Sequence, residues 1–374
     1  MSGDDVRVRV HEMFMQRAIE LARRGWYTTR PNPRVGCVIV SGNRVVRGEG
    51  WHERAGEAHA ERRALDDLAT RGHSAKGTTA YVTLEPCSHS GRTGPCTRAL
   101  IESGVARVVV GAQDPNPVVD GRGIAALREA GIEVVTGVLA ERCAALNRGF
   151  NQRMAHGRPR VRVKLAMSLD GRTAAADGSS QWISGTAARE DVHRLRAESG
   201  AVMIGRGTLA ADDPSLTVRL DGDWMQPLRV VLDTRLSMSP QARMLEQSGE
   251  TLVVTAADEC EAADALEAAG ARVLHAAGHD DGLDLARILS VLAEREINDV
   301  LVEAGPTLAG ALARAGLVDE FVIYVAPMLI GDAGRGLMAL SGAVGLDDAM
   351  HLVFDQVEPV GPDLRITARP ASRN

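Results

Sequence analysis

Short, mostly apolar runs recur along the chain, for example at residues 35–40 and 105–110, and residues 160–167 and 298–302 are further predicted strands. Segments with helical spacing, such as residues 59–71, separate these runs. Strands that are apolar on both sides must be covered on both faces of their sheet, and crossover helices between parallel strands supply that cover. The pattern therefore predicts an α/β fold in which helices pack on both faces of a sheet.

The alternation is interrupted once, by the turn-forming segment His156-Gly157-Arg158-Pro159, and then restarts. Glycine and proline both end helices, because glycine adopts the left-handed conformation and proline lacks a backbone N–H. A chain of 374 residues is long enough for two domains. We therefore expect one domain over residues 1–155 and a second, unlike one over residues 156–374.

Composition narrows the class of protein. Hydrophobic residues make up 45% and charged residues 25%, as in a folded globular protein, and a net charge of −6 argues against a nucleic acid partner. No apolar run approaches the ~18 residues of a membrane span, and the N-terminus lacks a signal-peptide core, so we expect no membrane partner. The five cysteines then indicate reduced thiols or metal ligands in the cytoplasm rather than a disulfide framework.

A metal-binding pattern lies in the first half. His59 is followed by Cys87 and Cys96, each preceded by a proline, and one imidazole with two thiolates is the ligand set of a catalytic zinc ion that keeps a position for water. Zinc lowers the pKa of that water, so hydroxide is available near neutral pH to attack a ring carbon. Glu61, two residues after the histidine, is placed to carry the proton to the ring and to the leaving amine. His-x-Glu followed by a Pro-Cys pattern is the signature of nucleobase deaminases.

The spacing of the two cysteines departs from that signature, with eight residues, 88–95, in place of two. The longer loop adds His89, Arg92 and Thr93 beside the metal, which indicates a substrate with more polar or anionic parts than a bare base. The alternative for any single cysteine is a small core side chain. The cysteines without comparable sequence neighbours are interpreted as core thiols: Cys37, Cys143 and Cys260.

The second half has no complete Gly-x-Gly-x-x-Gly fingerprint after a strand, and Gly205-Arg206-Gly207 is only a fragment of one. A more informative segment follows the strand that ends near Val302, where Gly305-Pro306 opens a helix. Free backbone N–H groups and the helix dipole would face a phosphate there. A plain strand–turn–helix connection has the same pattern, so both interpretations stay open.

Lys164 is unusual because only it and Lys76 are lysines among 43 basic residues. It lies in the otherwise apolar segment Val163-Lys164-Leu165-Ala166, and burial lowers the pKa of a lysine, so that it can donate a proton where an arginine cannot. We consider it a candidate proton donor. The alternative is a lysine that extends to the surface or pairs with a carboxylate such as Glu303. For two other residues a structural role is predicted. Asp212 is interpreted as a helix stop and Trp182 as a core aromatic.

Three stretches of the first half, TTRPNPRVGCVIV, GWHERAGEAHAE and TLEPCSHSGRTGPC, together resemble the deaminase half of the bifunctional riboflavin-biosynthesis protein. Four stretches of the second half, KLAMSLDGRTA, SSQWISG, TLAADDPSLTVR and VEAGPTLAG, resemble its reductase half in the same order. The resemblance implies a cytidine-deaminase-like, three-layer α/β/α domain followed by a dihydrofolate-reductase-like α/β domain.

The resemblance also implies the chemistry. The family removes the 2-amino group of 2,5-diamino-6-ribosylamino-4(3H)-pyrimidinone 5′-phosphate and then reduces the ribosyl group to ribityl with NADPH. We therefore expect a bifunctional enzyme of riboflavin biosynthesis, with Zn²⁺ and NADPH as cofactors. Its expected partners are a phosphorylated pyrimidine substrate and further copies of itself in a homo-oligomer.

Carried over position by position, the resemblance assigns residues to the two ligands. The substrate would be held by Asn32, His52, His89, Ser180, Arg196, Leu216, Arg219 and Glu303, with the two arginines suited to its phosphate. NADPH would lie along Ala166, Trp182, Thr208, Asp212, Thr234, Gly305, Pro306, Thr307, Leu308, Ala309, Gly310 and Ala311. Asn32 as a turn former and His52 as a surface histidine remain the alternatives. The charge of Arg206 favours the 2′-phosphate of NADPH.

Two other functions remain open on the sequence. One is a deaminase of RNA or free cytidine with a non-catalytic second domain, and the acidic net charge and 3% aromatic content disfavour the RNA version. The other is a nucleotide-binding regulatory protein that has lost catalysis. The presence of Glu61 with all three ligands disfavours this for the first half, but no single residue decides the second half.

Overall fold

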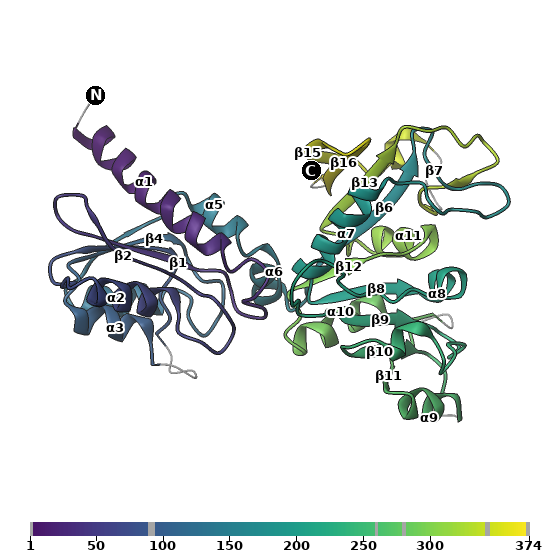
Figure 1. Ribbon diagram of the computed structural model, residues 1–374, viewed down its shortest axis with the longest axis horizontal. Coiled ribbons are helices and arrows are strands. Elements are labelled where there is room, and N and C mark those ends of the chain that lie inside the picture. The colour runs from purple at the N-terminus through teal and green to yellow at the C-terminus, as the bar shows by residue number, and fades with distance from the viewer. Residues whose placement is uncertain (1–2, 89–93, 259–260, 279–281, 341–344, 372–374) are drawn as a thin grey trace. The chain divides into compact units, whose positions relative to one another are not determined.

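The computed structural model describes residues 3–88, 94–258, 261–278, 282–340 and 345–371. The chain divides into two units, Met1–Gly157 and Arg158–Asn374, and the division falls inside the turn-forming segment. Each unit has its own sheet (Figure 1). Among the described helices, none is long and apolar enough to cross a membrane.

The described residues of the first unit form a five-stranded sheet in the order β2-β1-β3-β4-β5. Strand β1 is antiparallel to β2 and β3, whereas β3, β4 and β5 are parallel. Helices α1 and α5 cover one face and α2, α3 and α4 the other, which confirms the three-layer α/β/α arrangement. The elements are α1 (Gly3–Arg23), β1 (Gly36–Val40), β2 (Val46–Trp51), α2 (Ala60–Thr70), β3 (Thr79–Leu84), α3 (Cys96–Ser103), β4 (Arg107–Ala112), α4 (Arg122–Glu129), β5 (Glu133–Thr136), α5 (Ala140–Ala145) and α6 (Arg148–His156).

Glycines in the strands let two helices approach this sheet closely. Every residue of β1 is buried, as its apolar sequence predicts. A Cβ atom at Gly36 would lie 2.0 Å from the carbonyl oxygen of Ala18 in α1, and one at Gly50 would lie 2.4 Å from the backbone nitrogen of Ala64 in α2. A larger residue at either position would therefore push a helix away from the sheet.

Residues 140–156 form two separate helices, α5 and α6, rather than one continuous helix. Between them, Asn147 turns its side chain to a remote segment: Oδ1 accepts from the backbone N–H of Arg34 at 2.7 Å, and Nδ2 donates to the carbonyl of Arg34 at 2.9 Å. Asparagine competes with helical hydrogen bonding in this way. The two bonds hold the segment that carries Asn32.

The described residues of the second unit form a nine-stranded sheet in the order β11-β10-β9-β8-β12-β6-β13-β16-β15 and a small sheet of β14 and β7. The large sheet is parallel from β11 to β13 and antiparallel at β16 and β15. Its elements are β6 (Arg160–Ser168), β7 (Arg172–Ala174), α7 (Thr186–Glu198), β8 (Ala201–Gly205), α8 (Arg206–Asp212), β9 (Leu228–Leu232), β10 (Thr251–Thr255), α9 (Glu261–Ala268), β11 (Ala271–His275), α10 (Leu285–Glu294), β12 (Asp299–Val302), α11 (Pro306–Arg314), β13 (Glu320–Ala326), β14 (Arg335–Gly336), β15 (Leu352–Val360) and β16 (Asp363–Pro370).

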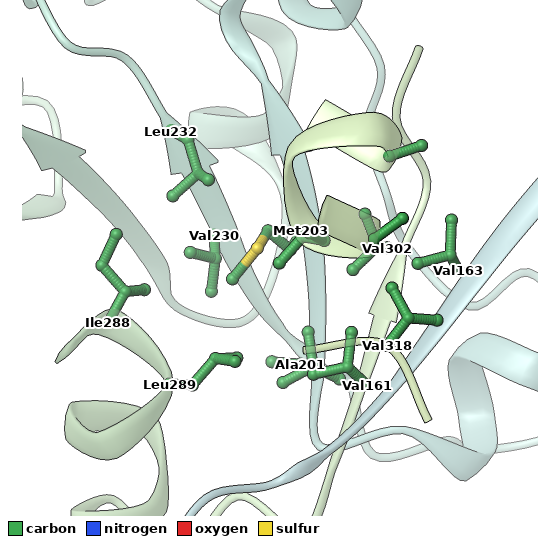
Figure 2. Close-up of a cluster of buried hydrophobic side chains, with 14 of the residues drawn as sticks. Val161, Val163, Ala201, Met203, Val230, Leu232, Ile288, Leu289, Val302 and Val318 are labelled. Atoms are coloured by element: carbon green, nitrogen blue, oxygen red, sulfur yellow. The ribbon is translucent and has the colours of Figure 1, made fainter. Parts of the chain in front are cut away.

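The core of this unit lies on both faces of the large sheet. Figure 2 shows part of one face, where Val161 and Val163 of β6 and Met203 of β8 belong to the same buried cluster as Ile288 and Leu289 of α10. Helices α7, α8 and α9 contribute to the cluster on the other face. Because side chains alternate along a strand, Lys164 and Ala166 lie on the α7 side. This alternation brings the predicted proton donor to the same face as Arg196.

Candidate active sites

Three candidate metal ligands meet in the first unit. His59 immediately precedes α2, Cys87 follows β3, and Cys96 is the first residue of α3. Their ligand atoms lie within 4.8 Å of one another. Nδ1 of His59 is 3.7 Å from Sγ of Cys87 and 3.3 Å from Sγ of Cys96. One nitrogen and two sulfurs at these separations fit a zinc ion with one further position for water or substrate.

The charges of the group also suit a divalent cation. Hydrogen bonds from the Cys96 side chain, and then from His59 and the Cys96 backbone N–H, lower the pKa of Cys87 and favour its thiolate. The same contact with Cys87 raises the pKa of Cys96. Two sulfur atoms this close hold one negative charge between them, and a bound cation stabilises the second thiolate.

Glu61 lies on the first turn of α2 and is only 3% exposed. Burial raises the pKa of its carboxyl group to about 7. A carboxyl group buried beside the ligands can exchange a proton with bound water. A cavity of about 250 Å³ opens at His59 and Cys96 and is also lined by Ala58, Arg62, Gly94 and Ala99.

The fold brings Asn32 and His52 together next to this group. Nδ2 of Asn32 lies 3.1 Å from Nε2 of His52, and Nδ1 of His52 lies 3.3 Å from the carbonyl oxygen of Ala58. The rings of His52 and His59 pack edge to face at 5.2 Å. His52 is buried, so its interpretation as a surface histidine is wrong. His89 lies outside the described residues.

Glu85 supports the segment that carries Cys87, and the sequence analysis missed it. Its buried carboxylate accepts hydrogen bonds from four backbone N–H groups of residues 114–124, at 3.0 to 3.2 Å. Four such bonds satisfy a buried carboxylate and fix the loop after β3 against the start of α4. The only sequence signal was an acidic residue directly after a buried strand.

The second candidate site lies at the carboxyl ends of parallel strands. Strands β6, β12, β8 and β9 are neighbours and run parallel, so residues 168, 302, 205 and 232 end at one edge of the sheet. The chain crosses from β6 over the position of β12 to β8, and ligands of α/β sheets bind at such a switch in strand order. Thr208, Thr234 and the segment 305–311 follow three of these ends.

Two features of this edge could accept a phosphorylated cofactor. Gly305 precedes α11, whose first residue is Pro306, so the predicted Gly-Pro helix start is confirmed. A Cβ at Gly305 or Gly207 would meet open space, and the backbone is therefore accessible there. A cavity of about 260 Å³ is lined by Arg206, Thr234 and Arg235.

The prediction that Trp182 is a core aromatic is wrong, because its side chain is 67% exposed. The guanidinium group of Arg189 lies over the ring, 4.6 Å from its centre. The neighbouring Gln181 donates to Oδ1 of Asp212 at 3.1 Å. Helix α8 ends at Asp212, as the helix-stop interpretation predicted.

A charged side chain of α7 and one that directly follows β12 meet on the same side of the sheet as Lys164. Nε and one terminal nitrogen of Arg196 donate to Glu303 at 2.6 and 2.9 Å, and the other terminal nitrogen donates to the carbonyl of Thr217 at 2.9 Å. Burial lowers the pKa of Lys164, an effect that Glu303 partly offsets and Arg196 reinforces. The close ion pair of Glu303 is with Arg196 rather than with Lys164. Nζ of Lys164 lies 5.9 Å from the ring centre of Tyr324.

The remaining predicted residues lie on the loops around these groups. Leu216 is buried and has a left-handed φ of 53°, which turns the chain before Thr217. One terminal nitrogen of Arg219 donates to Oγ1 of Thr217 at 3.4 Å. Ser180 is exposed, and Ala166 packs against the cluster on the α7 side.

Comparison with known proteins covers both units. Residues 159–366 match the RibD C-terminal domain, and residues 8–112 match the cytidine and deoxycytidylate deaminase zinc-binding region. The chain is 49% identical over 366 residues to riboflavin biosynthesis protein RibD of Escherichia coli, covering 94% of this chain and 97% of that protein. This chain belongs to the RibD family.

Solved structures agree over nearly the full chain. RibD of Acinetobacter baumannii (42% identity, TM-score 0.90) matches 98% of this chain and 100% of its own. The same shares hold for a Thermotoga maritima protein (35% identity, TM-score 0.86), named as a diaminohydroxyphosphoribosylaminopyrimidine deaminase/5-amino-6-(5-phosphoribosylamino)uracil reductase.

As a RibD-family protein, the chain is a bifunctional deaminase and reductase of riboflavin biosynthesis. Its first unit has the zinc-binding deaminase region with the His/Cys/Cys group, and its dihydrofolate-reductase-like second unit implies a nicotinamide cofactor. These findings confirm the predicted fold class, family and enzyme type. The alternative of a deaminase of RNA or free cytidine with a non-catalytic second domain does not fit a likeness to RibD that spans both units.

Proposed function

We propose that the first unit deaminates 2,5-diamino-6-ribosylamino-4(3H)-pyrimidinone 5′-phosphate and that the second unit reduces the ribosyl group of the product to ribityl with NADPH. The main support is one combination: the His59, Cys87 and Cys96 group beside buried Glu61, in a chain that matches the full length of the Thermotoga maritima deaminase/reductase. The product of the first reaction is then the substrate of the second.

In the deaminase unit, His59, Cys87 and Cys96 would hold zinc, which when bound lowers the pKa of a water molecule. Glu61 would take a proton from that water and deliver it to the ring nitrogen and the leaving amine, because its buried carboxyl group lies on the turn that begins at His59. The hydrogen-bonded Asn32 and His52 would orient the pyrimidine, together with His89.

In the reductase unit, NADPH would supply a hydride to C1 of the ribosyl group. Its proposed contacts are Ala166, Trp182, Thr208, Asp212, Thr234, Gly305, Pro306, Thr307, Leu308, Ala309, Gly310 and Ala311. The exposed ring of Trp182 offers a stacking surface, and the backbone after Gly305 offers N–H groups to phosphates. Arg206 and Arg235, which line one cavity, would bind the 2′-phosphate that NADH lacks.

The substrate of the second reaction would be held by Ser180, Arg196, Leu216, Arg219 and Glu303. Because Arg196 already bonds Glu303 and Thr217, the phosphate would rely mainly on Arg219. Lys164 would donate a proton to the ring oxygen of the ribosylamine, since the ring must open to an imine before hydride reaches C1. A buried lysine with a lowered pKa gives up a proton more readily than an exposed one.

We also propose that the protein acts in the cytoplasm and as a homo-oligomer. Thiolate ligands need a compartment that keeps cysteines reduced. In the second unit, the edge strand β15 exposes Phe354 by 67% and Val357 by 55%, and an apolar sheet edge of this kind favours coverage by a second copy.

The test is incubation of zinc-loaded protein with the diaminopyrimidinone phosphate, with and without NADPH, followed by mass analysis of the products. We expect the deaminated product under both conditions and the ribityl product only with NADPH. Failure to convert this substrate, together with deamination of cytidine or RNA, would contradict the proposal.

A further inference from the structure

Helix α7 places one row of polar side chains beside the proposed reductase substrate. Arg189, His193 and Arg196 are four and three residues apart, so they lie along one side of the helix. Arg189 packs on Trp182 and Arg196 pairs with Glu303. His193, between them, has no role in the proposed function.

The hydrogen bonds around His193 select one tautomer. Its Nδ1 lies 3.2 Å from the backbone nitrogen of Arg219 and 3.2 Å from the carbonyl oxygen of Thr217. A single ring nitrogen can accept from the first or donate to the second, but not both. The Thr217 carbonyl already accepts from Arg196 at 2.9 Å, whereas within the described parts of the chain the Arg219 N–H bonds only to this nitrogen. Nδ1 therefore accepts, and the proton lies on Nε2.

The Nε2–H group is a donor without an acceptor among the described residues. The ring is half-buried, and Nε2 is still accessible from solvent. It is therefore open to a ligand. Burial, Arg196 and Arg219 lower the pKa of His193 to about 4, against opposing effects of Glu303 and of the Thr217 backbone carbonyl. The ring is therefore neutral near pH 7, and it lies beside Arg219.

We propose that His193 is a further substrate-binding residue of the reductase, whose Nε2–H donates a hydrogen bond to the substrate phosphate beside Arg219. The inference rests on the proposed function of the second unit. Three of the five N–H groups of Arg196 donate to Glu303 and Thr217, which leaves few for a phosphate beside Arg219. His193 is bonded directly to the backbone of Arg219, so it is placed to supply another donor. Through Nδ1, the same ring also positions that arginine.

Two substitutions separate the two nitrogens of the ring. His193→Asn keeps an acceptor near the position of Nδ1 and removes the distal donor, whereas His193→Gln places an amide N–H group near the position of Nε2. For reduction of separately supplied deaminated substrate, we expect His193→Asn to raise KM about tenfold, the value of one hydrogen bond to a charged group. Its kcat and its KM for NADPH should change less than about twofold, and His193→Gln should stay close to wild type. Arg194→Ala, an exposed position on the same helix, is the matched control.

A binding experiment gives a readout besides activity. Calorimetry with ribose 5-phosphate should show the same loss of affinity in His193→Asn but not in His193→Gln or Arg194→Ala. Wild-type affinity and KM in His193→Asn, or an equal loss in both His193 variants, would overturn the inference. A wild-type protein that fails to reduce the substrate would contradict the proposed function instead, and the ribose 5-phosphate comparison would still decide the role of His193.

Discussion

The two candidate sites of this protein are assembled in different ways. In the deaminase unit, the ligand group comes from residues 59–96, and two of its members stand at the starts of α2 and α3. In the reductase unit, Lys164, Arg196 and Glu303 come from distant parts of the sequence and meet because β6, α7 and β12 are neighbours. The first site thus depends on local chain geometry, and the second on the packing of a whole sheet.

The charges of the two sites differ as well. The deaminase group is arranged for a cation that the protein must acquire, whereas the reductase charges already neutralise one another, as in the buried pair of Arg196 and Glu303. A site built around one ion should lose its activity completely when the ion is lost. A site built from many contacts should lose activity in steps. The following predictions test that contrast.

Removal of the zinc thiolates should have the largest effect. Cys87→Ser with Cys96→Ser replaces both soft ligands with hydroxyls that bind zinc poorly, so we expect no stoichiometric zinc and no measurable deamination. Metal analysis and product mass would check this. Reduction of separately supplied deaminated substrate should continue, and a simultaneous loss of reductase activity would show that the two sites depend on one another.

Glu61→Gln should leave zinc bound and lower the deamination rate by about 10² to 10⁴, because glutamine keeps the shape but cannot take a proton. The measurement is kcat for deamination beside zinc content. Exposed Glu57→Gln, near the same helix start, serves as the control. Near wild-type deamination in Glu61→Gln would show that another group moves the proton.

Lys164→Arg should lower the turnover of the reductase about 10²-fold while NADPH binding stays intact, because arginine keeps the charge but does not release a proton. NADPH oxidation on deaminated substrate, together with a cofactor titration, measures both. Unchanged turnover would assign Lys164 a structural role. Deamination should be the same as in wild type in either case.

Arg206→Ala and Arg235→Ala should each reduce the preference for NADPH over NADH about tenfold, because each removes one charged contact to the 2′-phosphate. The ratio of kcat/KM for the two cofactors measures this preference. Activity with NADH should change little, and an equal loss with both cofactors would place the arginines elsewhere on the cofactor.

The smallest expected effect is a pH dependence of stability. The folded pKa of His193 is about 4, below its ordinary value of 6.5, so the unfolded chain binds more protons between these values. Stability is full above pH 6.5 and falls as the pH drops toward 4. Since the ring is only half-buried, solvent screening limits the effect to about 1 kcal/mol. Between pH 7.5 and pH 5.0, the urea midpoint of unfolding should fall more for wild type than for His193→Asn. An equal fall in both proteins would show that His193 does not cause the pH dependence.

Features that depend on residue type and local order could be predicted from the sequence. The ligands His59, Cys87 and Cys96 could be named because few side chains bind zinc and their order along the chain is restricted. The apolar spacing of residues 59–71 predicted a helix, and α2 occupies Ala60–Thr70. The Gly-Pro start of α11 was predicted for the same local reason.

Contacts between remote groups could not be predicted in this way, because they depend on how the whole chain folds. The break between α5 and α6 follows from the bonds of Asn147 to Arg34, and the sequence analysis missed the β15–β16 hairpin, because β15 is mostly exposed and lacks a buried apolar run. The four bonds of Glu85, the cavity shared by Arg206 and Arg235, and the tautomer of His193 likewise depend on segments far apart in the chain. Hydrogen bonds between such segments leave no periodic signal in the sequence, because any of several polar residues could make them once the sheets have brought the backbones together.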